Sequence, residues 1–250
     1  MHKIKTLFIT CLFIFIFINI LHSQEELLSA KTLLERLSES FKTNVRDIKA
    51  DIRLIQGDMV STGILYFKNP QKIRIDFTDP ANQVICSNGY ELWVYIPYLN
   101  IVLHQDILER ERMKDDEDEK DEEKIKVNEE TENPDIIINP ILLNPVGLDK
   151  FLTEYSIEYH ETKEKINYKD GTKVYQLKLI RWRSTKHGFN VIYLIIQENG
   201  IIRQVRGITA NYKQITLELD KIELNNNISD LKFNYEPPAH TSTVDDFINK

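Results

Sequence analysis

The 250-residue chain contains only two cysteines, Cys11 and Cys86. Cys11 lies inside an N-terminal apolar run, and the one remaining cysteine can form neither an intrachain disulfide nor a zinc site. Cys86 sits in the apolar run QVICS, which favours a packed small side chain over a reactive thiol. The fold must therefore be stabilised by its hydrophobic core rather than by cross-links.

Glycine is also scarce, with eight residues, so glycine-rich phosphate-binding loops have little material to draw on. The sequence contains no G-x-S-x-G, no Walker A motif and no G-x-G-x-x-G. No two histidines lie at metal-ligand spacing, and no pair of carboxylates stands out from the many on solvated stretches. We expect no catalytic residues, no metal and no cofactor, and we do not predict an enzyme.

Charge is distributed unevenly along the chain. Lys114–Glu132 holds eleven acidic residues and four lysines, and its net charge of −7 equals that of the whole chain. Such a block cannot bury itself, so we expect a solvated, mobile insertion at about residues 113–134. It either solubilises the chain or docks a basic partner surface. Elsewhere basic residues are scattered singly, and with a negative total we expect no nucleic-acid partner.

The N-terminal residues have the features of a secretory signal peptide. Two lysines precede the fifteen-residue apolar run Leu7–Leu21, and Ser23 is a small residue in front of a polar one. The run is short for a membrane-spanning helix, which needs about 20 residues. We expect cleavage near Ser23, leaving residues 24–250 as a single domain. The alternative is an uncleaved membrane anchor.

The remaining sequence predicts a helix followed by many strands. Glu25–Phe41 has apolar residues three and four apart, which is typical of an amphipathic helix. The pattern then changes to alternation, as in KIRIDF. Asn-Gly and Asp-Gly dipeptides favour type I′ turns. They predict three strand pairings: Val84–Ser87 with Glu91–Ile96, Lys165–Tyr168 with Lys173–Trp182, and Phe189–Gln197 with Ile201–Ala210.

Further features complete the expected fold. A one-residue slip in ITLELDKIELN predicts a bulge at Asp220 or Lys221, and LKFNYEPP is expected to form the last strand. Leu148, Phe151, Leu152 and Tyr155 have helical spacing. About ten or eleven strands are too many for a flat sheet, so the predicted fold is mainly β and strongly curved or barrel-like.

Three predicted strands are apolar on both faces: ILYFK (64–68), LWVYI (92–96) and VIYLII (191–196). An antiparallel sheet with one solvated face should instead alternate apolar and polar residues. Either both faces are covered by other parts of the protein, or one face lines an apolar cavity. The sequence leaves both interpretations open and does not say which side of each strand faces such a cavity.

One series of motifs resembles a known family. Gly63 is followed by Lys68-Asn69-Pro70, by Asn88-Gly89 and by Leu92–Pro97, and the chain ends with FNYEPPAHTSTVDD. In this order and spacing, the motifs resemble those of the outer-membrane lipoprotein carrier protein of the bacterial periplasm, LolA. The resemblance extends over Glu25–Asp246 and is densest over Gly63–Val102.

The resemblance implies an unclosed antiparallel β-barrel of about 10–11 strands, with a few α-helices as a lid over an apolar cavity. It implies a periplasmic carrier that binds the acyl chains of lipoproteins and ferries them from the inner to the outer membrane. Each methylene removed from water is worth about 0.8 kcal/mol, so a lipid with roughly forty methylenes cannot cross water unaided. The alternative is a lipid- or lipoprotein-sensing module on the same scaffold.

The partners implied by the resemblance are acylated lipoproteins as cargo and an ATP-driven lipoprotein-releasing complex of the inner membrane. The resemblance also leaves room for a receptor at the outer membrane, and we expect a monomer. The candidate acyl-chain contacts, each of which could instead be an ordinary core residue, are Leu65, Phe67, Ile73, Ile75, Phe77, Trp93 and Tyr95 on strands and Leu143, Phe151 and Leu152 on the lid.

One position departs from the family pattern. The family often has arginine between the lysine and the proline of the second strand, where it would hydrogen-bond the lid. Asn69 occupies that position here. We therefore predict that Asn69 is a lid-latch position and that the lid is held more weakly.

Overall fold

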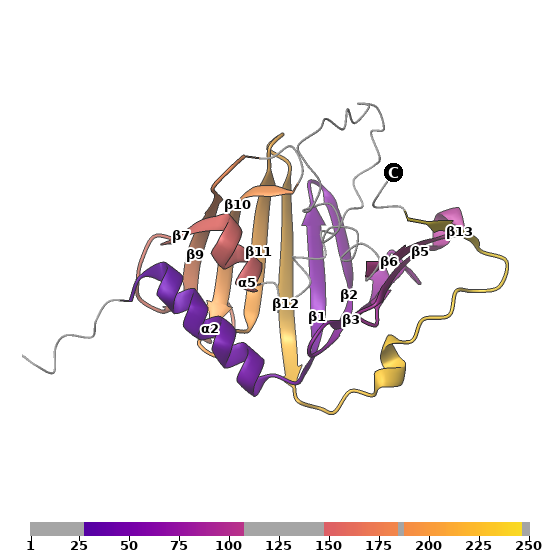
Figure 1. The fold of residues 1–250 in the computed structure, drawn as a ribbon, viewed down its shortest axis with the longest axis horizontal. Coiled ribbons are helices and arrows are strands. Elements are labelled where there is room, and N and C mark those ends of the chain that lie inside the picture. The colour runs from indigo at the N-terminus through magenta and orange to yellow at the C-terminus, as the bar shows by residue number, and fades with distance from the viewer. Residues whose placement is uncertain (1–27, 108–147, 185–187, 247–250) are drawn as a thin grey trace, which may run out of the picture.

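The protein is described by a computed structural model over residues 28–107, 148–184 and 188–246 (Figure 1). The predicted signal peptide, the acidic insertion and Leu143 lie outside these described residues.

The described residues form a thirteen-stranded sheet with two α-helices. The helices are α2 (Ala30–Asn44) and α5 (Leu148–Glu154), with short 3-10 helices η1 (Pro97–Leu99) and η3 (Asp230–Phe233). The strands are β1 (Asp47–Gln56), β2 (Met59–Lys68), β3 (Lys72–Asp79), β4 (Val84–Ser87), β5 (Glu91–Ile96), β6 (Ile101–Asp106), β7 (Tyr155–Tyr159), β8 (Ile166–Asn167), β9 (Lys173–Arg181), β10 (Phe189–Gln197), β11 (Ile202–Thr209), β12 (Gln214–Leu224) and β13 (Ser242–Asp245).

The sheet is one curved, unclosed surface (Figure 1). Its strands follow the order β13-β6-β5-β4-β3-β2-β1-β12-β11-β10-β9-β7, with β8 beside β9. Neighbours are antiparallel except β13, which pairs parallel with β6. The predicted mainly β, open-barrel fold is confirmed. The strand number was underestimated, because the helical spacing that includes Tyr155 obscures β7 and because β13 is only four residues long.

The three strand pairings predicted from the Asn-Gly and Asp-Gly turns are confirmed. All three predicted pairings are present, as β4 with β5, β8 with β9, and β10 with β11. The predicted bulge is also present. Lys49 is opposite Glu223 whereas Asp51 is opposite Asp220, so one residue of β1 faces two of β12. Lys221, within the bulge, has a φ of 47°.

The N-terminal helix begins later than predicted. Ser29 is its N-cap, and the Ser29 hydroxyl accepts a hydrogen bond from the backbone N–H of Thr32 at 3.1 Å. The helix continues beyond Phe41 to Asn44, where the side-chain amide of Asn225 donates to the Asn44 carbonyl at 2.9 Å. Both ends are thus set by hydrogen bonds, and apolar periodicity alone does not reveal them.

The prediction that LKFNYEPP forms the last strand is wrong. Asp230–Phe233 forms the 3-10 helix η3, which starts where the Ser229 hydroxyl accepts from the Leu231 N–H at 3.3 Å. The capping hydrogen bond of Ser229 favours a helical turn, which forms here in place of the strand that the alternating pattern predicts. The final strand is β13, which adds to β6 further along the chain.

The two faces of the sheet are covered by different segments. Leu65, Ile75, Ile85 and Val94 are directly opposite one another across β2 to β5 and so share one face, the inner face. Helix α2 lies on this side, where the Phe41 ring contacts Phe67 with centroids 5.8 Å apart. The opposite, outer face is crossed by the segment Asn225–Thr241, here called the C-terminal strap (Figure 1, yellow).

The turn between β10 and β11 packs directly against α2. A Cβ atom on Gly200 would lie 2.2 Å from the Leu37 carbonyl oxygen and 2.7 Å from Phe41 Cβ. Gly200 also has a φ of 80°, a conformation that other residues rarely adopt. Glycine is therefore required at this position for two independent reasons.

We predict that Gly200→Ala lowers the free energy of unfolding by about 3 kcal/mol, because it adds overpacking to backbone strain. Gly171→Ala is the matched control. Gly171 has a similar φ of 82° but open space around it, so its loss should be about 1 kcal/mol. Urea unfolding of both variants measures the difference. Equal losses would contradict close packing between this turn and α2.

Candidate functional site

The inner face of the sheet is mainly apolar. Leu65, Phe67, Ile75 and Phe77 are all buried there, and Ile73 is partly buried against them. Ile73 is opposite Phe67 in the register of β2 and β3, which places it on the same face. Five of the predicted strand contacts are thus brought together in one cluster.

The same cluster continues onto the helices. Phe151 of α5 is 2% exposed, and Leu152 is partly buried against the same core. Helix α2 contacts both α5 and β7 and contributes buried leucines to the cluster, as Figure 1 shows for their arrangement beside β9 to β11. The predicted short helix after residue 147 is confirmed as α5. Its two candidate residues therefore join the strand candidates.

The junction of α5 and β7 is held by one tyrosine. The Tyr155 ring meets Phe151 edge-on with centroids 5.7 Å apart, and its hydroxyl donates to the Phe189 carbonyl at 2.8 Å. Arg181 lies over the ring at 5.4 Å and pairs with Glu154. Burial raises the pKa of the Tyr155 phenol, which keeps it a neutral donor. The C-terminal end of α5 is thus fixed to the sheet through polar contacts at the edge of the apolar cluster.

Trp93 and Tyr95 lie on the other side of the sheet. Trp93 is opposite Cys86, and Cys86 is opposite Arg74, so all three belong to the outer face. Trp93 stacks on His104 with centroids 3.9 Å apart and lies 6.3 Å from the Tyr235 ring of the strap. The structure therefore separates these two candidates from the inner-face cluster by the thickness of the sheet.

The strap covers the outer apolar residues and is anchored along its length. Asp230 pairs with Lys68 and Lys72 at 2.6 and 3.2 Å, and Lys232 pairs with Asp76 at 2.8 Å. Strand β5 is therefore apolar on both faces because helices and sheet cover one face while the strap crosses the other. Sequence reasoning missed this cover. Its signal was Ser229, a capping residue within an apparent strand.

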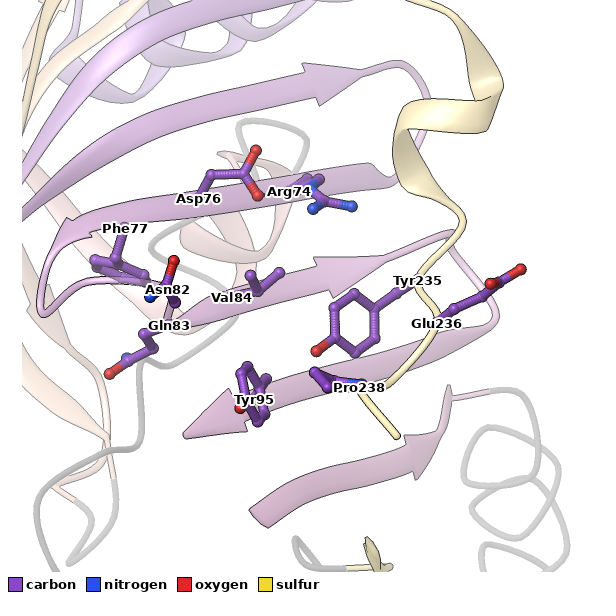
Figure 2. A pocket seen from close by; sticks show the side chains of 10 residues that line it. All are labelled: Arg74, Asp76, Phe77, Asn82, Gln83, Val84, Tyr95, Tyr235, Glu236 and Pro238. Carbon is purple, nitrogen blue, oxygen red and sulfur yellow. Dashed lines mark hydrogen bonds and ion pairs between the residues drawn. The ribbon is translucent and has the colours of Figure 1, made fainter. Parts of the chain in front are cut away.

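A pocket of about 390 Å³ lies on the outer face between β3, β4, β5 and the strap (Figure 2). Arg74 and Asp76 line it and pair with each other at 2.7 Å. Tyr235 also lines it, and among the described residues its buried hydroxyl has no hydrogen-bond partner. Burial raises the pKa of Tyr235 to about 12. The pocket lining mixes these groups with apolar side chains. The inner face is mainly apolar, with Ser87 and Gln105 as buried polar side chains on β4 and β6, and is therefore the better surface for acyl chains.

The C-terminal end of α2 is held by two asparagines. The Asn69 side-chain amide donates to the carbonyl of Val45, the residue that follows α2, and the Asn69 backbone N–H donates to the Arg46 carbonyl at 2.8 Å. Asn225 holds the same end from the strap, accepting from the Arg46 N–H at 2.7 Å. Asn69 is thus located beside the helix. Its role as a latch stays a prediction.

Within residues 28–107, 148–184 and 188–246, no three His, Cys, Asp or Glu side chains lie close enough to hold a metal ion. None of the helices in these same ranges combines the length and the apolar character that a membrane span requires.

The family model described as outer membrane lipoprotein carrier protein LolA matches residues 55–140. The predicted resemblance to the LolA family is confirmed. The matched segment includes β2 to β6, the strands that carry most of the candidate residues of this LolA-like chain. The comparison with curated proteins found no match.

Solved structures share the fold at low sequence identity. An uncharacterized conserved protein from Thermus thermophilus has a TM-score of 0.51 and 10% identity, over 86% of this chain and 98% of that one. MucB has a TM-score of 0.51 and 11% identity over 86% of this chain, which spans 65% of the MucB chain. A Pseudomonas aeruginosa MucA/MucB complex has a TM-score of 0.48 and 10% identity, over 83% of this chain and 61% of that one. The two matches with TM-scores of 0.51 show a similar fold and nothing beyond it.

Cys86 is buried beneath the C-terminal strap, so its reactivity tests whether the strap covers this part of the outer face. Cys86 is fully buried, its Sγ lies 3.3 Å from the Phe233 carbonyl, and burial raises its pKa to about 11 from 9.0. In a Cys11→Ala background, we predict labelling by a thiol reagent at pH 8 at least about 100-fold slower in the folded than in the urea-unfolded protein, because two pKa units remove that much thiolate.

Phe233→Ala, which opens the strap over the thiol, should accelerate the labelling of Cys86. Equal labelling rates in folded and unfolded protein would contradict a strap that seals this part of the outer face.

We also predict that Asn69→Ala increases the amide hydrogen exchange of the last turn of α2 by about fivefold to tenfold, because one hydrogen bond near the helix end is lost. Asn88→Ala is the matched control. Asn88 accepts hydrogen bonds from Tyr90 and Glu91 within its own turn, so its loss should leave α2 unchanged. Unchanged exchange in both variants would remove the latch role.

Proposed function

We propose that this LolA-like chain binds the acyl chains of lipoproteins at its inner face and carries them through the periplasm from the inner to the outer membrane. The observation that carries the proposal is the unclosed sheet whose inner face is mainly apolar and meets two helices. The family match supports it, since members of the LolA family bind cargo rather than catalyse reactions.

Binding requires the helices to move. Phe67 is completely buried, and the Phe41 ring of α2 packs against it, so an acyl chain takes the place of the α2 side chains. Each methylene transferred from water contributes about 0.8 kcal/mol, which offsets the cost of uncovering apolar side chains. Because the sheet has two free ends, β13 and β7, it can widen without breaking strand pairs. The helices then serve as a lid.

The route of transport defines the expected partners. The cargo would be released from the inner membrane by an ATP-driven complex and delivered at the outer membrane, with or without a receptor there. Export of the chain would depend on the proposed signal peptide. The acidic stretch would either solubilise the chain or meet a basic surface on a partner. Both segments lie outside the described residues.

A sensing module is the second candidate function. It is favoured by the fold shared with MucB, a protein also solved in complex with MucA. A sensor would hold its ligand at the same inner face but would pass a signal to a protein partner. In contrast to a carrier, its removal would leave lipoproteins correctly distributed between the two membranes.

Neighbouring residues of β5 provide a direct test. Leu92 and Trp93 point to the inner and outer face, respectively. With the photo-crosslinking residue p-benzoylphenylalanine at position 92, we expect crosslinks to acylated lipoproteins in periplasmic extracts. With the same residue at position 93 we expect none, because the strap and His104 occupy that side.

Crosslinks at position 93 alone would place the cargo on the outer face and contradict the proposal. Circular dichroism establishes that both substituted proteins are folded. Depleting the protein then separates the two candidate functions, since lipoproteins accumulate in the inner membrane only if the chain is a carrier.

A further inference from the structure

Large apolar side chains are exposed at one end of the sheet. Met59 is 61% exposed, Tyr98 72%, Trp182 69% and Tyr212 88%, with Val60 and Leu99 exposed beside two of them. We call this group the apolar rim: Met59, Val60, Tyr98, Leu99, Trp182 and Tyr212. Single exposed apolar residues are ordinary on a protein surface, but a group confined to one end is not.

Strand register places these residues at the same end. Gln56 is opposite both Met59 and Ile215, so the β1–β2 and β11–β12 turns are adjacent. Trp182 follows β9 at its Arg181 end, which is opposite Tyr155. Strand β10 lies between β9 and β11, and its Phe189 end is next to the Arg181 end of β9 and to the last residues of β11. Trp182 therefore lies on the same side of the sheet as the β11–β12 turn.

The β5–β6 connection, which holds Tyr98 and Leu99, belongs to the same end. Ile96 is opposite Ile101 beside this connection, and the preceding Tyr95 is opposite Val84 at the start of β4. The β3–β4 turn before Val84 lies next to Thr62, close to the β1–β2 turn. In Figure 1 the β1–β2 and β11–β12 turns lie along the upper side of the sheet, and the β5–β6 connection lies at its right, beside β13.

The turns at the other end have a different composition. They are built from polar residues, glycine and one proline, as in Asn69–Gln71, Asn88-Gly89, Asp170-Gly171 and Asn199-Gly200. Large exposed apolar residues near that end are Tyr90 and Leu231. Among the described residues, the large exposed apolar side chains are therefore concentrated at one end of the sheet and are not spread evenly over the protein surface.

The chemistry of the rim fits a lipid surface. Trp and Tyr favour the headgroup region of a bilayer, where one part of the ring is apolar and the other is wet. The described residues in and beside the turns at this end include three acidic ones, Asp58, Asp79 and Glu154, and three basic ones, Arg181, Arg183 and Lys213. This balance matches zwitterionic lipids better than an anionic surface.

We propose that the apolar rim is a membrane-contact surface, which inserts side chains from four separate connections into the headgroup region of a zwitterionic bilayer. Side chains on separate turns do not enclose a groove for a peptide, but each can enter a soft surface independently. The contact goes beyond cargo binding. It would bring the open sheet to the membrane at which acyl chains enter or leave.

Trp182 reports on the contact directly. The chain has two tryptophans, so Trp93→Phe leaves Trp182 as the single emitter. On addition of protein-free vesicles of phosphatidylcholine and phosphatidylethanolamine, we expect a blue shift of its emission and protection from acrylamide. In flotation with the same vesicles, Met59→Ser combined with Tyr212→Ser should weaken binding by about tenfold or more.

The matched control combines Tyr90→Ser with Leu231→Ser, which removes exposed apolar side chains away from the rim and should leave vesicle binding unchanged. Unchanged Trp182 emission at saturating lipid, or equal losses in rim and control variants, would overturn the proposal. Rim-dependent binding to native inner-membrane vesicles but not to protein-free ones would overturn it in favour of a protein partner. No acylated cargo is present, so failure here leaves the crosslinking result at position 92 unaffected.

Discussion

An antiparallel sheet that does not close leaves an apolar inner face that must be kept from water, and the rest of this structure depends on that constraint. A closed barrel would fill its interior with its own side chains and have no free strand ends. Here the path ends at β7 and β13, and helices α2 and α5 pack on the inner side with the sheet. The cover comes from separate segments, which can move while strand pairing is retained. This separation of scaffold and cover suits a protein that takes up a large apolar guest and later releases it.

The apolar side chains of the outer face are covered in a different way. The strap lies over the apolar side chains there and is anchored by Asp47, a buried carboxylate that accepts from the backbone N–H groups of Asn226 and Asn227 at 2.8 and 3.1 Å. Charged pairs such as Lys232 with Asp76 then hold it to β3. Asn225, at the start of the strap, also binds the end of α2. The strap therefore connects the cover of the outer face to the helix on the inner one.

Local chemistry decided how much of this could be predicted from the sequence. The Asn-Gly and Asp-Gly turns identified three hairpins, because those dipeptides have few other uses between apolar runs. The slip near Lys221 identified the bulge. The strap was misread as a strand, since its course depends on contacts with residues more than 150 positions away, such as Asp76. For the same reason the side on which Trp93 and Tyr95 lie was not predictable. Alternation shows that neighbouring residues of a strand lie on opposite faces of the sheet. It does not show which of the two faces the helices cover, because that depends on the order of the strands in the folded protein.

The central claim is that the inner face accepts acyl chains in place of helix side chains. Native mass spectrometry of the full chain with a triacylated lipopeptide, and with the same peptide lacking its acyl chains, tests it most directly. The account predicts a complex of one acylated peptide per chain and none with the bare peptide. Equal binding of both peptides, or binding of neither, would contradict it.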